Sequence, residues 1–276
     1  MTATSQSEAD PTATAWRPRD IARQVLVIAA FVFMIVGDAV GLGAFGGTPI
    51  QDAQGGSFSP DASYLTPATG AFAIWTPIYL GLAVYTVWQA LPGQRTSPRQ
   101  RAMGWLVAVT MVCNGLWLVT VQLLSVWATV AVVVLLLAAL VAAYLRSVRT
   151  RRPDAGVVDA VLIDRVTGLH LGWAALATVA NLGAALTVTV PASWVAAADW
   201  LGVLVLAAVA AIGLAVSRAG GWRIAPVLAI GWGLAWLAVA RLGGEPASIA
   251  IGTAAIAAAV VVVGVPLVAR LRRGAA

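Results

Sequence analysis

The segment VWATVAVVVLLLAALVAAYL, residues 126–145, runs for twenty residues without a charge. An α-helix rises about 1.5 Å per residue, so about 20 apolar residues cross the hydrocarbon core of a bilayer. Further runs of comparable length occupy residues 24–45, 69–91, 103–123, 166–188, 198–217, 223–241 and 247–269. The sequence therefore predicts an all-α integral membrane protein with eight transmembrane helices.

The composition agrees with a membrane protein and excludes an ordinary soluble domain. Hydrophobic residues make up 61% of the 276 residues and charged residues only 10%, with a mean hydropathy of +0.90. Soluble proteins carry about 25% charged residues. Cys113 is the only cysteine, so the chain cannot form an internal disulfide or a thiolate metal cluster.

The basic residues are distributed unequally between the two sides of the predicted bundle. All seventeen are arginines, and only Arg241, beside Glu245, falls in a connection on the side away from the termini. Cytoplasmic segments of membrane proteins are enriched in Lys and Arg. We therefore predict a multi-pass protein of the cell (plasma) membrane with both termini in the cytoplasm. No basic patch is interleaved with exposed aromatics, so we expect no nucleic-acid partner.

Three of the predicted helices carry polar or aromatic side chains at helical spacing, on one face of each helix. They are Trp75 and Tyr79; Asn114 and Trp117; and His170, Trp173, Ala177 and Asn181. An amide in hydrocarbon turns toward a partner or a cavity. Two interpretations stay open: an aromatic-lined pocket shared by the three helices, or polar contacts that only hold the helices together.

Counting residues from the predicted helix ends places six of the polar and tryptophan side chains at similar depths in the membrane, namely Asp38, Trp75, Asn114, Trp117, Thr178 and Asn181. Segments 126–145, 198–217 and 247–269 contribute almost no polar group at that depth, and we expect them to be lipid-facing walls. The connection 46–68 is rich in Gly, Pro and Ser and cannot be helical throughout. It either folds over the outer mouth of the bundle or is a solvated loop.

At these residues the chain resembles the TspO/MBR family, the tryptophan-rich sensory proteins related to the translocator protein, or peripheral benzodiazepine receptor. The family patterns W-x3-Y, N-x2-W and W-x3-A-T-x2-N match at residues 75–79, 114–117 and 173–181. The resemblance covers the first five segments, residues 24–188. It departs at Thr69, where the family has a further Trp, in the AFAI run at 71–74 instead of Phe-Gly-Pro, and at Leu169 and His170 instead of Pro-Tyr.

The resemblance implies a domain division and a function. Residues 1–20 would be a disordered cytoplasmic tail, 21–190 a TspO-like five-helix membrane domain, and 191–276 three additional transmembrane helices with a short cytoplasmic tail. The protein would bind a flat hydrophobic ligand, a porphyrin (tetrapyrrole) or sterol-like molecule, with a sensory, regulatory or transport role. The expected ligand-binding residues are Trp75, Tyr79, Asn114, Trp117, His170, Trp173, Ala177 and Asn181. No cofactor is required, and porphyrin or haem would enter only as a ligand.

The chain contains no carboxylate pair, zinc motif, nucleophile elbow or phosphate loop, so we expect no catalytic or metal-binding residues and no enzyme. Two alternatives stay open. A secondary transporter of a small hydrophobic solute would use an intramembrane charge, for which Asp38 and Asp199 are the candidates. A membrane enzyme acting on tetrapyrrole or lipid would use Asp38 or His170 for proton transfer. The sequence leaves monomer and homodimer both open.

His170, the only histidine, has two interpretations. As a neutral imidazole it could bind haem iron or contact a tetrapyrrole carboxylate. It could instead replace the family's Tyr and form a hydrogen bond between helices or near Asp164 and Arg165. A lone histidine without a second ligand or a haem motif favours the second interpretation.

Overall fold

The computed structural model describes residues 16–153 and 155–274, and within these ranges it has helices and no strand. Eight helical stretches are long and apolar enough to cross a membrane, which confirms the predicted eight-helix, all-α membrane architecture. They are α1 (Pro18–Gly41), η3 with α3 (Thr69–Ile74, Trp75–Ala90), α4 (Pro98–Leu123), α5 (Val126–Arg149), α6, η5 and α7 (Val157–Asp159, Ala160–Arg165, Val166–Thr187), η6 and α8 (Ala192–Ala197, Ala198–Ala219), α9 (Ala225–Gly243) and α10 (Ile249–Gly274).

Several helices extend beyond the apolar runs at the arginine-rich end. α1 begins at Pro18 and α4 at Pro98, six and five residues before the predicted starts, because a proline at the first helical position fits the helix geometry. At the other end α1 stops at Gly41, four residues early. Gly43 follows with a φ of 85°, a left-handed conformation that ends helices and favours glycine.

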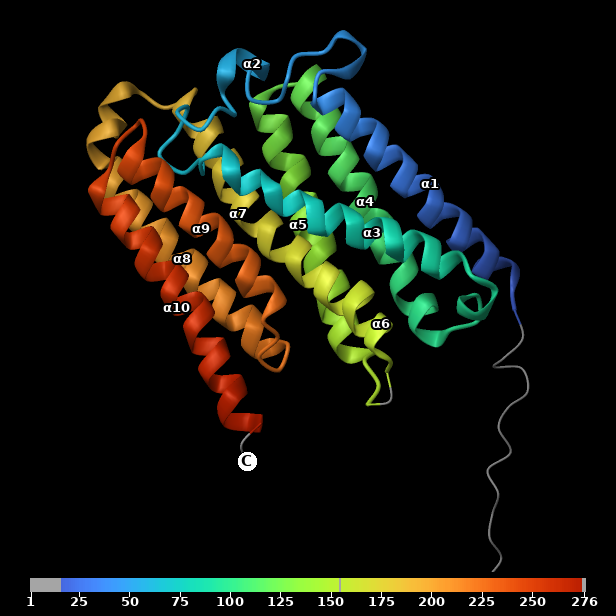
Figure 1. Ribbon diagram of the computed structural model, residues 1–276. Coiled ribbons are helices and arrows are strands. Elements are labelled where there is room, and N and C mark those ends of the chain that lie inside the picture. The colour runs from blue at the N-terminus through green and yellow to red at the C-terminus, as the bar shows by residue number, and fades with distance from the viewer. Residues whose placement is uncertain (1–15, 154, 275–276) are drawn as a thin grey trace, which may run out of the picture.

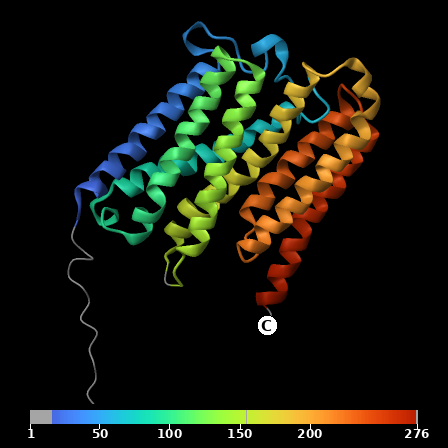
Figure 2. The ribbon, with the colours of Figure 1, turned by 180° about the vertical axis from the view of Figure 1, so that it is seen from behind.

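The helices form a layer in which α1, α4, α5, α7 and α9 are successive neighbours, and α8 and α10 pack on the α9 side (Figure 1). α3 crosses one face of this layer obliquely and lies behind it in the reverse view (Figure 2). It contacts α1 and α7, while η3, which precedes it, contacts α9. α3 therefore connects the two halves of the layer.

Glycines allow close approach at two helix contacts. A Cβ on Gly37 of α1 would lie 2.8 Å from the carbonyl oxygen of Gly115 on α4. A Cβ on Gly172 of α7 would lie 2.0 Å from the carbonyl oxygen of Pro226 on α9. Small residues at such positions are the usual means by which membrane helices pack tightly. The second contact joins the first five spans to the last three.

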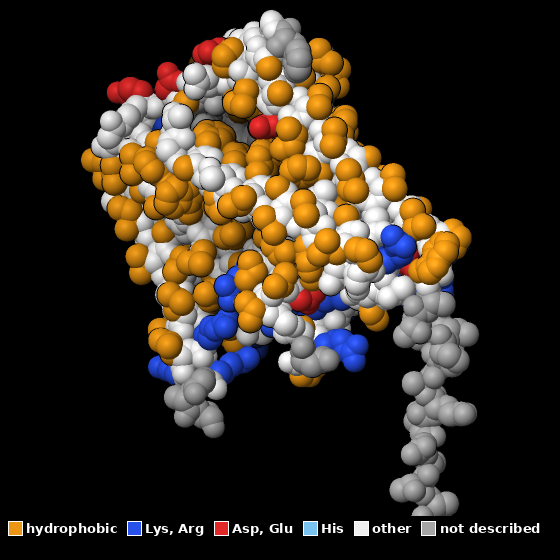
Figure 3. Space-filling view, turned by 45° about the vertical axis from the view of Figure 1, so that its right-hand side comes forward, with side chains coloured by type: hydrophobic (Ala, Val, Ile, Leu, Met, Phe, Trp, Pro, Cys, Tyr) orange, Lys and Arg blue, Asp and Glu red, His pale blue; other side chains and the backbone are white. Residues whose placement is uncertain are grey.

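The arginines gather at the end of the bundle that holds the C-terminus, and acidic side chains appear at the opposite end (Figure 3). Many of these arginines are paired. Asp164, on the π-helical turn η5, accepts hydrogen bonds from Arg99 and Arg151 and lies 3.1 Å from Arg223. Arg99 also pairs with Asp159 at 2.7 Å. This network joins the start of α4, the segment after α5, the turns α6 and η5 that precede α7, and the turn before α9 at the arginine-rich end.

The connection 46–68, here called the cover loop, lies over the opposite end of the bundle between α1 and η3 (Figure 1). Gln54 donates to the carbonyl of Val121 at 2.9 Å, and Gln122 donates to the carbonyl of Thr48 at 2.6 Å. Both bonds fasten the loop to the end of α4. Of the two interpretations of this segment, the structure therefore favours a loop folded over the bundle.

Candidate functional site

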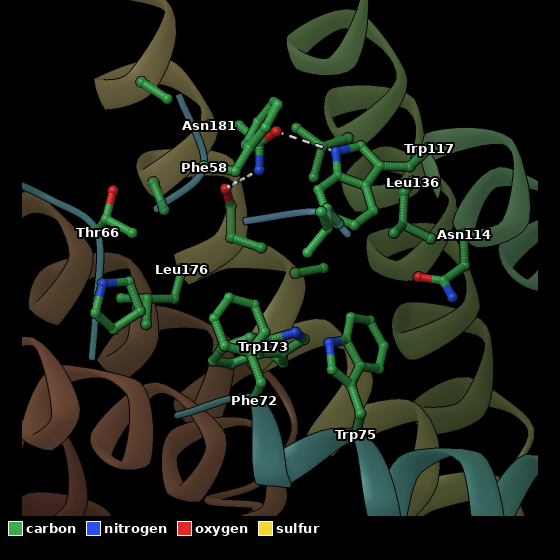
Figure 4. Close-up of a pocket in the computed structure, with 17 residues that line it drawn as sticks. Phe58, Thr66, Phe72, Trp75, Asn114, Trp117, Leu136, Trp173, Leu176 and Asn181 are labelled. Carbon is green, nitrogen blue, oxygen red and sulfur yellow. Dashed lines mark hydrogen bonds between the residues drawn. The ribbon is translucent and has the colours of Figure 1, made fainter. Parts of the chain in front are cut away.

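A cavity lies beneath the cover loop, between α3, α4, α5 and α7 (Figure 4). It encloses about 730 Å³ of empty space, part of which is continuous with the outside. The cover loop contributes Ile50, Phe58, Thr66 and Pro67 to its walls. The remaining walls are mostly aromatic and aliphatic, as is typical of small-molecule pockets.

Four aromatic rings from different elements surround this space. Phe72 comes from η3, Trp75 from the start of α3, Trp117 from α4 and Trp173 from α7. The Trp173 ring meets Phe72 edge-to-face at 5.8 Å between centroids and Trp75 at 6.0 Å. Phe58 of the cover loop meets Trp117 edge-to-face at 6.4 Å. Edge-to-face contacts stabilise aromatic clusters, so the rings form a fixed wall around the cavity.

On one side of the cavity, three polar side chains form a hydrogen-bonded chain across three helices. The amide of Asn114 on α4 donates to the Tyr79 hydroxyl at 3.0 Å, and that hydroxyl donates to Asp38 Oδ1 on α1 at 3.3 Å. The close approach of α1 and α4 at Gly37 and Gly115 places these groups within reach of one another. The chain leaves Asn114 Oδ1 buried without a partner.

On the other side, α4 and α7 are joined by a single polar contact. The indole Nε1 of Trp117 donates to Asn181 Oδ1 at 3.0 Å, and Asn181 Nδ2 donates to the carbonyl of Ala177 one turn earlier at 2.8 Å (Figure 4). The contact fixes the plane of the Trp117 ring against the cavity. Trp173 Nε1, by contrast, is buried with no hydrogen-bond partner.

A second cavity adjoins the first and opens beside α1. It encloses about 1110 Å³, including open space, and shares Ile50, Phe58, Phe72, Trp75 and Trp117 with the first cavity. Its remaining walls include Asp38 and Tyr79. The rings of Trp75 and Trp117 thus contribute to the walls of two adjoining cavities, one almost wholly apolar and one with a carboxyl group.

The cover loop is also held from the side of the last three helices. Arg241 of α9 is only 1% exposed, and its guanidinium donates to four backbone carbonyls. Two belong to the cover loop, Pro60 at 2.8 Å and Ser63 at 3.1 Å, and two follow α9, Pro246 at 2.8 Å and Glu245 at 3.1 Å. Charge-assisted hydrogen bonds of this kind are strong. Arg241 therefore acts as a clamp on the loop and is not a solvated turn residue.

Two tryptophans of α9 support the start of η3, which carries Phe72. The carbonyl of Trp236 accepts from the Ala68 N–H at 3.1 Å, and Trp232 Nε1 donates to the carbonyl of Ala71 at 2.8 Å. The Trp236 ring lies so close to Gly70 that a Cβ there would be 2.3 Å from it. α9 thus positions the floor of the cavity as well as its cover.

The structure brings most of the predicted site residues together. Six of them line the first cavity, namely Trp75, Asn114, Trp117, Trp173, Ala177 and Asn181, and Tyr79 lines the second. His170 lines neither. It is 1% exposed, packs edge-to-face against Trp75 at 5.8 Å, and its Nε2 has no hydrogen-bond partner. The hydrogen bond expected in place of the family's Tyr is not formed by Nε2, and a role in ligand binding for all eight residues stays a prediction.

Other residues of the site were not predicted. Segment 126–145 was expected to be only a lipid-facing wall, but Val133 and Leu136 of α5 line the first cavity. The expectation was wrong because an aliphatic helix carries no pattern that distinguishes its cavity face from its lipid face. Phe58 and Arg241 were missed because their contacts depend on the path of the cover loop.

The chemistry of the two cavities is that of a binding site for a largely apolar molecule. Rings offer stacking surfaces, Asn114 and Trp173 offer an unused acceptor and donor, and Asp38 offers a carboxyl group. Across the described ranges, no group of three or more His, Cys, Asp and Glu side chains is placed to hold a metal ion.

The comparisons with known proteins agree with this architecture. No curated protein and no solved structure matches the chain. A family model described as TSPO-like protein matches residues 24–268, a range that begins within α1 and ends within α10 and so includes part or all of every span. The match confirms the resemblance to the TspO/MBR family and extends it beyond residues 24–188, the range to which the sequence motifs had confined it. The chain is a multi-pass membrane protein that belongs to the TSPO-like protein family.

Proposed function

We propose that this TspO-type membrane protein binds a flat hydrophobic ligand, a tetrapyrrole or a sterol-like molecule, in the cavity beneath the cover loop. Binding would serve a sensory, regulatory or transport role and not catalysis. The observation that carries the proposal is the convergence of Phe72, Trp75, Trp117 and Trp173 on one space. Flat rings arranged around a cavity provide stacking surfaces for a flat molecule.

The polar atoms of the cavity that lack a hydrogen-bond partner support a role in ligand binding. Buried polar groups in proteins are almost always hydrogen-bonded. Asn114 Oδ1 and Trp173 Nε1 are both buried without a partner, and both residues line the cavity. A ligand in the cavity with a donor and an acceptor would pair these two atoms.

A secondary transporter is the second candidate, favoured by Asp38. Intramembrane carboxylates commonly mark the path of a transported solute or proton, and Asp38 lines the second cavity. Movement of the ligand across the membrane of proteoliposomes would favour a transporter, and binding without such movement would favour a sensory role. Conversion of the ligand to a product would instead favour a membrane enzyme.

We also propose that the protein resides in the plasma membrane with its termini and its arginine-rich end in the cytoplasm. Sixteen arginines of seventeen support this orientation, because positively charged segments are retained on the cytoplasmic side. The cover loop and the two cavities would then open toward the outside.

A binding screen tests the proposed function. The protein, purified and placed in lipid nanodiscs, is titrated with protoporphyrin, haem, cholesterol and a carotenoid, and affinity is read from the midpoint of tryptophan quenching. We expect saturable binding of at least one class. Trp117→Ala should lose about 1–3 kcal/mol of binding, roughly 5–150-fold in affinity.

The matched control is Trp105→Ala, since Trp105 lies on the same helix, is 41% exposed and lines neither cavity. We expect it to bind like the parent. Absence of saturable binding for every class, or equal losses in the two variants, would contradict the proposed site.

A further inference from the structure

Asp38 is the one charged side chain in the walls of the two cavities described above. It is partly buried in α1. Its partner is the hydroxyl of Tyr79, at 3.3 Å from Oδ1, and no arginine of the described ranges forms an ion pair with it. A carboxylate in a partly desolvated site is costly unless it has a positive partner. The second cavity thus offers a carboxyl group without a cationic partner, and a positively charged ligand would stabilise its ionised form.

Two oxygen acceptors of the hydrogen-bonded chain around Asp38 remain without a partner among the described residues. Asn114 gives its amide proton to Tyr79, and Tyr79 gives its hydroxyl proton to Asp38. Asn114 Oδ1 is therefore left as an unused acceptor, and Asp38 Oδ2 has no partner among the described residues. A ligand that enters here needs N–H or O–H groups to satisfy them.

Aromatic rings lie next to this carboxylate. Tyr79, which bonds to Asp38, has its ring 5.0 Å from that of Trp75, and Trp117 and Phe58 complete the same compartment. Faces of Trp and Tyr attract cations, and the attraction increases when water is excluded. A carboxylate together with these rings is suited to a positively charged group attached to a flat apolar body.

The exposed side chains at the cover-loop end of the bundle carry charge of the same sign as an ionised Asp38. Exposed acids at this end of the bundle are Asp52, Asp61, Asp199 and Glu245. The hydroxyl of Ser59 donates to Asp61, which lowers the pKa of that carboxyl and keeps it ionised. The arginine at this end, Arg241, is buried and donates to four carbonyls. An excess of exposed acids at this end of the bundle attracts cations and repels anions.

We infer that the ligand class of this protein is a flat aromatic molecule that carries a protonated amine, with the ammonium group on Asp38 and the ring system between Trp75 and Trp117. The inference rests on the proposed function and narrows it. A porphyrin with two ionised carboxylates would bring negative charge toward Asp38 and be disfavoured by like-charge repulsion. An amine-bearing ligand would supply the missing partner.

Three probes share the flat pyrene ring and differ in charge, so they separate the effect of ligand charge on affinity from the effect of ligand shape. They are 1-pyrenemethylammonium, 1-pyrenemethanol and 1-pyrenecarboxylate. Each is titrated into the protein in zwitterionic nanodiscs, with empty nanodiscs as the blank, and binding is read by energy transfer from tryptophan to pyrene. We expect the ammonium compound to bind at least about tenfold more tightly than the alcohol, since a charge-assisted hydrogen bond forms. The carboxylate should bind most weakly of the three.

Two substitutions of Asp38 and one control substitution test whether this residue causes the preference for the ammonium compound. Asp38→Asn keeps an acceptor for Tyr79, so pyrenemethanol binding should be unchanged while the preference for the ammonium compound is lost; Asp38→Glu should keep the preference. Asp52→Asn removes the same charge from an exposed position outside both cavities and should leave the preference intact. Equal binding of the three probes to the parent, or an ammonium preference that survives Asp38→Asn, would overturn the inference while leaving the proposed function standing. Absence of binding of all three probes would also overturn the inference, whereas the proposed function fails only if the screen of porphyrins, sterol and carotenoid finds no saturable binding.

Discussion

Arg241 of α9 and Pro60 of the cover loop lie 181 positions apart in the chain, and the guanidinium Nη2 of the first donates to the carbonyl oxygen of the second at 2.8 Å. The last three helices therefore close the cavity that the first five form. Because the arginine is buried and its partners are backbone carbonyls, the contact depends on the loop's path and not on its side chains.

Replacement of Arg241 by Met should loosen the cover loop. Hydrogen bonds to a charged group contribute about 1.5–3 kcal/mol each, so loss of the clamp should raise the population of open loop by at least about tenfold. A cysteine at Ser57, which is 8% exposed in the loop, reports opening through its rate of thiol labelling in a Cys113→Ala background. Arg218→Met, at an exposed arginine of the other end, is the control. Equal labelling rates in the two variants would show that Arg241 does not hold the loop.

Gly172→Ala should destabilise the contact between α7 and α9. The new Cβ would lie 2.0 Å from the carbonyl oxygen of Pro226, and such overpacking typically costs about 1–3 kcal/mol. Thermal unfolding in detergent measures the effect. Gly264→Ala is a matched control, since this helical glycine of α10 has nothing within 4 Å of an added Cβ and alanine is the better helix former. A Gly172→Ala protein as stable as the control would mean that the two helices can separate without loss.

His170→Tyr should leave ligand affinity within a few fold and change no haem spectrum. His170 lines neither cavity and lies behind Trp75, against which its ring packs at 5.8 Å. A residue without contact to the ligand contributes little to its binding. Absorption spectroscopy with haem and with metal-free porphyrin checks the prediction. Loss of a Soret shift in the variant, with porphyrin binding intact, would instead identify His170 as a haem ligand.

Much of the site could be predicted because local spacing determines which side chains share a helix face. Trp75, Asn114, Trp117, Trp173 and Ala177 were placed around one pocket from i, i+3 and i, i+4 spacing and from family patterns, and all five line one cavity. Depth could be predicted because a helix has a fixed rise per residue. The apolar runs themselves gave the eight spans.

The remaining features depend on contacts that no local pattern encodes. Arg241 was expected in a turn beside Glu245, yet its loop partners are the carbonyls of Pro60 and Ser63, which are present whatever the side chains are. The stripe that includes Trp173 also includes His170, but His170 lies about one helical turn nearer the arginine-rich end. Its ring packs against Trp75 and lines neither cavity. The proposed tail, 1–20, falls partly outside the described residues, and α1 already begins at Pro18.

The orientation in the membrane is open to a direct labelling test. In a Cys113→Ala background, single cysteines replace Asp52, exposed in the cover loop, and Gly93, exposed between α3 and α4 with open space around it. An impermeant thiol reagent added to whole cells should modify the cysteine at 52 and spare the one at 93 until the cells are permeabilised, because arginine-rich segments face the cytoplasm. The reverse pattern would invert the proposed topology.

A larger side chain placed inside the cavity beneath the cover loop tests whether a ligand occupies it. Ala177 lines it and Ala175, two residues earlier on α7, lines neither cavity. The measurement is the affinity of the parent's best ligand for Ala177→Leu and for Ala175→Leu, with both proteins shown to unfold at the parent's temperature. We expect Ala177→Leu to lower the affinity for the ligand at least about tenfold, because overpacking of a filled site typically costs about 1–3 kcal/mol. Ala175→Leu should bind the ligand as the parent does. Parent-like binding by both variants would contradict occupation of this cavity by a ligand.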